Sequence, residues 1–161
     1  MNEITMGNAT MFCYASDLLA KRMNEGVTAL SSGNLSRDSI LSSQLVVPVI
    51  VNASFACELF LKSILPPDTR GHKLQELFSA LSNDLQNEIM ELTISNMKDT
   101  DSDYSIEQFQ QDLEKNSNNF AEWRYFHEGH SHEANLHFIV SLSSVLSHIA
   151  SQQKMKESFQ N

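Results

Sequence analysis

Glycine and proline are scarce in this chain, which has only five Gly and three Pro among its 161 residues. A sandwich or barrel of short strands needs frequent turns, and these two residue types usually make them. Their scarcity therefore favours long helices over an all-β fold. The length is typical of one domain, and a hydrophobic content of 41% is enough for one core.

Positive charge is also in short supply. The chain has 11 Lys and Arg against 20 Asp and Glu, which gives a formal net charge of -9. An acidic chain repels nucleic acid at long range, so any contact with RNA must come from a local positive spot. The sequence contains no cluster of basic residues, which argues against a general nucleic-acid-binding protein, and no DNA partner is expected.

Cysteine is limited to Cys13 and Cys57, which are far apart and lie among apolar residues. This usage is typical of small core residues in a reducing compartment and not of a disulfide framework. The first ten residues, MNEITMGNAT, lack the basic and apolar parts of a signal peptide. The longest apolar run, Leu45–Cys57, is too short to cross a bilayer. We therefore expect a cytoplasmic protein with no membrane association.

The apolar residues recur with helical periodicity, and no stretch has the alternation of a strand. The pattern predicts an all-α, up-and-down helical bundle in a single domain, 1–161, with a core over about 8–150 and a frayed tail over 151–161. Helices are expected over about 7–25, 38 or 43 to 65, 74–81, 82–97, 105–115, 120–128 and 133–153.

Several residues predict where these helices begin and end. Gly26 is expected to end the first helix and to open a loop over 26–36. Pro48 belongs to the first turn of the second helix or kinks it, and Pro66 with Pro67 stops that helix. Ser105 with Gln108 has the spacing of a capping box.

The second expected helix is apolar nearly all round, which is typical of the buried centre of a bundle. One polar stripe remains on it, formed by Ser54, Glu58 and Lys62 at intervals of four residues. In one interpretation Glu58 and Lys62 form a salt bridge along the helix. In the other, the stripe lines a site in which Glu58 orients the guanidinium of Arg124.

Arg124 and His130 are the candidate catalytic residues. Cleavage of a phosphodiester needs a proton acceptor near neutral pH, which His provides, and a fixed cation for the charge that develops, which Arg provides. A 2′-hydroxyl of RNA can be the nucleophile, so no metal is required. Alternatively, Arg124 pairs with Glu122 or Glu128, and His130 caps the last helix.

The same region offers a metal site as an alternative. His127, His130 and His132 could bind zinc or nickel, with Glu128 or Glu133 as a further ligand. However, their spacing matches no known structural zinc site, so a solvated polar turn is the favoured interpretation. No metal and no cofactor is therefore expected.

Large aromatic residues surround Arg124. Trp123, Tyr125 and Phe126 are more typical of core or dimer-interface anchors than of platforms for stacking bases. Tyr125 and His127 are also candidates for supporting the site at Arg124, together with Glu58 and Lys62. His72 follows Gly71 at the start of an expected helix, where it is expected to cap or pack.

Three segments, taken in order, resemble the HEPN superfamily (higher eukaryotes and prokaryotes nucleotide-binding domain). Asn52–Leu65 is similar to its long second helix, with an Ala, a Glu and a Leu-Lys pair. Gly71–Phe78 is similar to its Gly-His-x-Leu turn and short helix. Glu122–His130 is similar to the segment that holds the family's Arg-x(4–6)-His motif. The resemblance covers about residues 8–150.

The resemblance implies a homodimer in which the Arg and His of both chains meet and cut RNA without a metal. Carried over, Arg124 would bind the scissile phosphate, and His130 would be the general acid and base. Many family members belong to toxin–antitoxin or other defence systems, often beside a minimal nucleotidyltransferase. An antitoxin or such a nucleotidyltransferase is therefore an expected protein partner.

The residue after the Arg separates two hypotheses. Active ribonucleases of the family usually have a polar residue there, whereas this chain has Tyr125. The Arg-Tyr form is more similar to members that bind nucleotides or partner proteins. The first hypothesis is a metal-independent endoribonuclease, or a nucleotide- or RNA-binding relative of one, from a defence or toxin–antitoxin system. The second is a non-catalytic protein-interaction module without nuclease activity.

Overall fold

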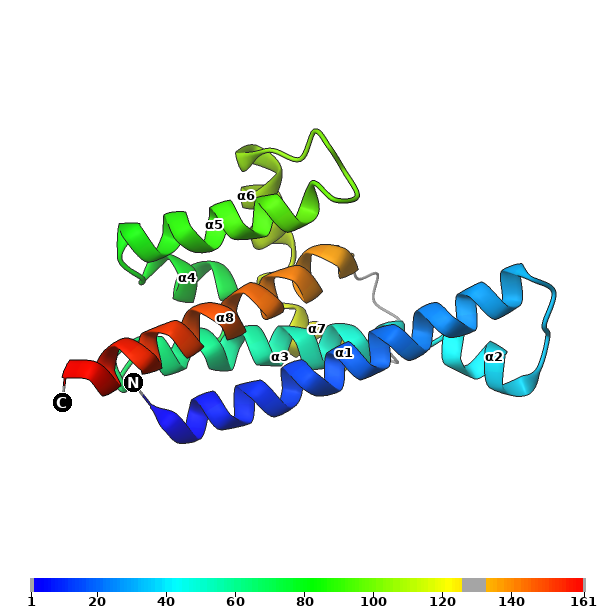
Figure 1. The fold of residues 1–161 in the computed structure, drawn as a ribbon, viewed down its shortest axis with the longest axis horizontal. Coiled ribbons are helices and arrows are strands. Elements are labelled where there is room, and N and C mark those ends of the chain that lie inside the picture. Colours follow the sequence, from blue (N-terminus) through cyan, green and yellow to red (C-terminus); the bar gives the residue numbers. More distant parts are fainter. Residues whose placement is uncertain (1, 126–132, 161) are drawn as a thin grey trace.

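In a computed structural model, the chain is an all-α protein, with 76% of its residues in helices that pack as a bundle (Figure 1). The structure describes residues 2–125 and 133–160, and these residues contain no strand. The all-α prediction is therefore confirmed. The two ends of the chain lie at the same end of the bundle, where Lys154 Nζ pairs with Glu3 Oε1 at 3.1 Å.

Helix α3, Val46–Ile64, is the buried centre, as its composition predicts. Its neighbours include α1, Glu3–Ser31, and α8, Leu136–Gln160 (Figure 1). Pro48 lies in the first turn of α3, where a missing N–H costs little. The helix ends at Ile64, shortly before Pro66. A separate short helix, α2, Arg37–Ser43, precedes it.

By length and composition alone, one stretch of the described residues, Arg37–Ile64, is apolar enough to cross a membrane. This stretch covers α2 and α3 and is longer than the apolar run Leu45–Cys57 recognised in the sequence. Half of its most apolar window is buried inside the bundle. The central position of α3 accounts for its apolar composition, because such a helix must contact other helices on most sides.

Helix α1 does not end at Gly26 but continues to Ser31, so the prediction of a loop over 26–36 is wrong in its first half. Gly26 instead lies where α2 crosses α1. A Cβ atom at Gly26 would be 2.6 Å from Ser43 N and 2.8 Å from Ser42 Cβ. The glycine therefore permits close packing of two helices and does not stop one.

The orientation of α1 also differs from expectation. Met11, Tyr14 and Leu18, which the periodicity assigns to its apolar face, are 63%, 65% and 51% exposed. The small residues Ala9 and Cys13 face the core instead. Small side chains let α1 approach α3 closely, and a stripe of large apolar residues is left on the surface.

A second group of helices covers another side of α3 and α8 (Figure 1). It consists of α4, Leu74–Ser79, α5, Asn83–Met97, and α6, Ile106–Lys115. Ser82 caps α5, and Ser105 forms the predicted capping box with Gln108. These helix starts are correctly predicted because a cap depends on side chains only three residues apart.

Helix α7, Asn119–Trp123, is a short helix packed against α3. Helix α8 begins at Leu136, three residues later than predicted, and extends to Gln160, beyond the predicted end at Gln153. Helical periodicity in the sequence places Ile139, Leu142 and Leu146 on the apolar face of α8, and all three are buried. The same periodicity places Ser141 on the opposite, polar face, but it is only 8% exposed.

Candidate functional site

Arg124 directly follows α7, and its side chain is exposed. Its Nε donates a hydrogen bond to the carbonyl oxygen of Phe120 at 3.0 Å. Its guanidinium carbon lies 4.4 Å from the centre of the Phe120 ring and 5.6 Å from that of Tyr125. These contacts orient the guanidinium and use one of its five N–H donors. Among the described residues its two terminal amino groups have no partner, so they are available to an anion.

A column of aromatic rings positions Arg124 relative to the bundle. Phe12 of α1 contacts Phe55 of α3 edge to face, with ring centres 4.6 Å apart. Phe55 stacks on Phe120 of α7, with centres 4.2 Å apart. The guanidinium of Arg124 lies over the last ring of this column. Three helices therefore fix the position of a single cation.

The buried amide of Asn116 is a second positioning element. Its Nδ2 donates to the carbonyl oxygen of Asp112 at 2.7 Å. Its Oδ1 accepts from Asn119 Nδ2 at 2.7 Å and from the backbone N–H of Asn135 at 3.1 Å. Asn119 begins α7, and Asn135 directly precedes α8. One side chain thus holds both ends of the segment that carries Arg124 and His130.

Asp112 reinforces this arrangement. Its Oδ2 accepts a hydrogen bond from Tyr104 Oη at 2.7 Å and from Asn135 Nδ2 at 2.8 Å. Burial and the hydrogen bond to Asp112 raise the pKa of Tyr104 well above its usual value, so the phenol keeps its proton. Asn135 Oδ1 in turn accepts from the N–H of Phe138 at 3.1 Å in the first turn of α8.

The polar stripe of α3 forms a different cluster. Glu58 is 2% exposed, and its Oε1 accepts from Lys62 Nζ at 2.9 Å. The predicted salt bridge is therefore present. The same oxygen lies 2.8 Å from Nδ1 of His72, which follows α3 in the loop before α4. His72 does not simply cap or pack at the start of α4, because its ring contacts a buried carboxylate of another helix.

Glu58 and Lys62 are not joined to Arg124 within one chain. Among the described residues, Glu58 contacts Lys62 and His72, whereas Arg124 contacts Phe120 and Tyr125. In this structure, therefore, Glu58 does not orient the guanidinium.

Several predicted site residues lie outside the residues that the structure describes. These are His127 and His130, together with the alternative metal ligands Glu128 and His132. Glu133 is described, and it pairs with Lys115 at 2.9 Å. Within 2–125 and 133–160, no group of three His, Cys, Asp or Glu side chains is arranged to hold a metal ion.

The aromatic residues around Arg124 divide into two kinds. Trp123 is 8% exposed and packs as a core anchor, which is the favoured interpretation of its sequence context. Tyr125 is 51% exposed and lies beside the guanidinium. Tyr125 and Arg124 together therefore present a ring and a cation to solvent.

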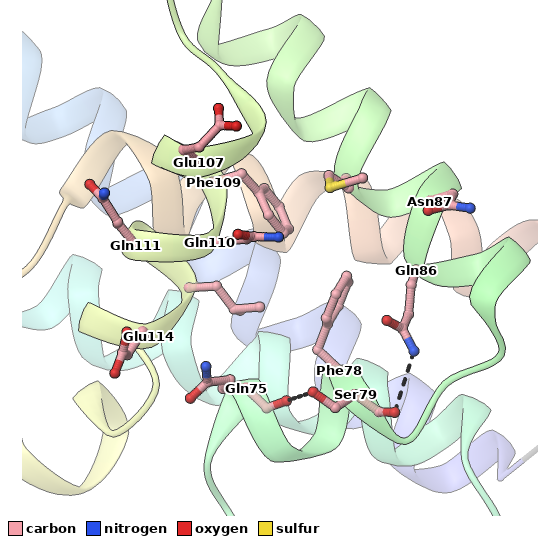
Figure 2. A pocket seen from close by; sticks show the side chains of 12 residues that line it. Gln75, Phe78, Ser79, Gln86, Asn87, Glu107, Phe109, Gln110, Gln111 and Glu114 are labelled. Carbon is pink, nitrogen blue, oxygen red and sulfur yellow. Dashed lines mark hydrogen bonds between the residues drawn. The ribbon is translucent and has the colours of Figure 1, made fainter.

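A hollow between α4, α5 and α6 is a further concave surface (Figure 2). It is lined by Gln, Asn and Glu side chains around the rings of Phe78 and Phe109. Gln86 Nε2 donates across one edge to the carbonyl oxygen of Ser79 at 3.3 Å. No Lys or Arg lines this hollow and Glu107 and Glu114 do, so it is unsuited to phosphate.

Comparison of the chain with models of protein families, with curated proteins and with solved structures finds no match. The fold and the site therefore define the class of protein directly: an all-helical bundle that presents an oriented arginine. Sequence reasoning missed the contact between His72 and Glu58 and the role of Asn116. The polar run Asn116–Asn119 was the available signal, since four polar residues between two amphipathic helices can be buried when they hydrogen-bond each other.

Proposed function

We propose that this protein is a HEPN-like bundle that binds the phosphate of a nucleotide or RNA through Arg124, with His130 completing a metal-independent endoribonuclease site. The observation that carries the proposal is the orientation of the Arg124 guanidinium. Its guanidinium is oriented by the Phe120 carbonyl and ring, while its outer amino groups have no partner within residues 2–125 and 133–160. A planar cation held in this way suits two-point binding of a phosphate.

The surroundings of Arg124 support this function in two further ways. Tyr125 provides an exposed ring beside the cation, on which a base could stack. Asn116 bonds to Asn119 and Asn135, so described residues on both sides of His130 in the sequence are attached to the same buried side chain. A preorganised cation near an imidazole is the arrangement that phosphodiester cleavage by an internal 2′-hydroxyl needs.

The proposed protein is a cytoplasmic homodimer, because the resemblance to the HEPN superfamily implies that Arg124 and His130 of two chains form one site. A dimer also offers a use for the exposed stripe of Met11, Tyr14 and Leu18, which no described residue covers. An antitoxin or a nucleotidyltransferase of a defence system is the proposed further partner.

The test is cleavage of a labelled RNA pool in the presence of EDTA, together with RNA binding by fluorescence anisotropy. Wild type should bind and cut. Arg124→Ala should lose binding, and Arg124→Lys should retain only part of it, because Lys keeps the charge but not the planar fork. His130→Ala should bind without cutting.

Arg37→Ala is the matched control, since Arg37 is exposed on α2 and its loss changes the net charge equally. Equal weakening by Arg37→Ala and Arg124→Ala would show a general charge effect and would refute a site at Arg124. Binding without any cutting at high protein concentration would restrict the function to nucleotide or RNA binding.

A protein-interaction module is the second candidate function, favoured by the apolar stripe on α1. Three large side chains, Met11, Tyr14 and Leu18, are each more than half exposed along one helix face. If this stripe is the functional surface, Tyr14→Asp should abolish assembly measured by light scattering and should leave RNA binding unchanged. Loss of RNA binding in Tyr14→Asp would instead connect the stripe to the site at Arg124.

A further inference from the structure

We infer that the cleft formed by the loop between α3 and α4 is a second phosphate-binding site, built from Lys62, Arg70 and His72 and independent of Arg124. The four residues that carry charge or an imidazole in this cleft are Lys62, Asp68, Arg70 and His72. Lys62 and Arg70 are its permanent cations. The carboxylates near them are Asp68 in the lining, the buried Glu58 that Lys62 contacts at 2.9 Å, and Glu76, whose Oε2 would lie 3.5 Å from a Cβ at Gly71.

The contact with Glu58 fixes the proton on the ring of His72. A carboxylate can only accept hydrogen bonds, so His72 Nδ1, 2.8 Å from Glu58 Oε1, must carry the proton. The other ring nitrogen, Nε2, then faces solvent, since the side chain of His72 is 73% exposed. This carboxylate–imidazole pair orients a ring that can accept a proton from a ligand or, once protonated, donate one to it.

The cations in the cleft have unused hydrogen-bond donors. Lys62 Nζ has three N–H bonds and gives one to Glu58, while its side chain is 22% exposed. Arg70 is exposed and makes no hydrogen bond or ion pair within 2–125 and 133–160. A small oxyanion with several acceptor oxygens matches such a set of donors better than a neutral ligand does.

The backbone of the loop adds further donors. In the part of the chain that the structure describes, the N–H groups of Arg70, Gly71 and His72 donate to no carbonyl or side chain. Gly71 has φ +100°, a conformation that side chains rarely allow, and it turns the chain so that His72 reaches back to Glu58. Successive free N–H groups beside a left-handed residue are a common setting for bound anions.

The test uses inorganic phosphate as the probe and isotope-labelled full-length protein observed by NMR. Phosphate should shift the ring signals of His72 and the amide signals of Arg70 and Gly71 along one saturable curve. The ring of His148, which is exposed on α8 beside Gln152, is the internal control and should not follow that curve. Equal responses at His72 and His148 would overturn the proposal.

Two variants test whether phosphate binds at this cleft or responds only to the net charge of the protein. Arg70→Gln should weaken phosphate binding by about tenfold, while Arg37→Gln should leave it unchanged although it removes the same charge. Equal weakening in both variants would overturn the proposal. Arg124→Ala should retain the phosphate response at His72, so failure of this site and failure of the proposed function can be distinguished.

A second arm identifies the source of the phosphate. A short RNA is added with and without a terminal phosphate. If only the phosphorylated RNA displaces inorganic phosphate from the cleft, the ligand is a phosphate monoester. If both do so, the cleft binds a phosphodiester backbone. If neither RNA displaces inorganic phosphate while free phosphate still binds, the ligand is a small phosphate compound. All three outcomes support a phosphate site in the cleft.

Discussion

At the scale of single residues, buried amides and carboxylates have specific partners that determine where the functional side chains lie. Asn116 is fully buried and connects Asn119 with Asn135, on either side of the segment with His130. Glu58 is nearly as deeply buried and connects Lys62 with His72. Such groups cost free energy unless they are hydrogen-bonded, so each of them constrains the chain around it.

Asn116→Ala should lower the free energy of unfolding by roughly 1–3 kcal/mol, because it leaves buried hydrogen-bond groups of Asn119 and Asn135 without a partner. Urea unfolding measures this. Asn118→Ala is the matched control, since Asn118 is exposed and its side chain donates to Glu122 Oε1 on the surface. If both variants unfold at the same urea concentration, the buried amide is not a constraint on this segment.

At the scale of helices, Gly26 and Gly7 of α1 offer a direct comparison. Gly26→Ala should destabilise by about 1–3 kcal/mol, because the new Cβ meets backbone atoms of α2. Gly7→Ala should stabilise by roughly 0.5–1 kcal/mol, since Gly7 has no atom within 4 Å of an added Cβ and alanine favours helix. Thermal melting of both variants checks this. If both substitutions shifted the melting temperature in the same direction, the close packing at Gly26 would be contradicted.

Helix α7 depends on Trp123 for its attachment to the bundle. Trp123→Ala should cost about 3–5 kcal/mol, because the ring is 8% exposed. Tyr125→Ala should change stability by less than about 0.5 kcal/mol, since that ring is half exposed. Urea unfolding compares the two variants. A small effect at Trp123 would mean that α7 is not held by its core contacts.

At the scale of the whole molecule, three weak acids are held in their protonated form by the fold. Burial raises the pKa of the Cys57 thiol well above its ordinary value, and nearby Cys13 raises it further. Burial also raises the pKa of Cys13, and that of Tyr104. Both thiols are free and buried, which confirms the interpretation of the cysteines as core residues.

These shifts predict loss of stability at alkaline pH. Each group has a higher pKa folded than unfolded, so its contribution is complete below the unfolded pKa and is lost as pH rises above it. For a thiol the loss begins near pH 8.5. Urea unfolding at pH 7.5, 9 and 10 should show a steady decline, of up to about 1.4 kcal/mol per pH unit from Cys57.

Cys57→Ala provides the control for this pH dependence. This variant lacks one of the two thiols whose pKa is raised by folding. Its free energy of unfolding should therefore fall less steeply above pH 8.5 than that of wild type. A wild-type stability that stays constant to pH 10 would show that the thiols titrate in the folded protein as they do when unfolded.

Local sequence determined the parts of this fold that depend on neighbouring residues. The caps at Ser82 and Ser105, the stop before Pro66 and the buried character of α3 follow from residues within about one turn of each other. Arg124 is recognisable as a candidate site residue from the sequence because it belongs to the short Arg-x(4–6)-His motif. The salt bridge of Glu58 with Lys62 was predicted for the same reason, since four residues separate neighbours on a helix face.

Tertiary structure decided which surfaces meet. Periodicity shows that α1 has an apolar face, but it cannot show that Met11, Tyr14 and Leu18 lie outside, because that depends on where α3 packs. Glycine often ends a helix, which is why the sequence predicted an end at Gly26. In the structure, Gly26 instead allows α2 to pack closely against α1. The contact between His72 and Glu58, and the clamp of Asn116, join residues whose distance is set by loops and helix packing and not by a helical repeat.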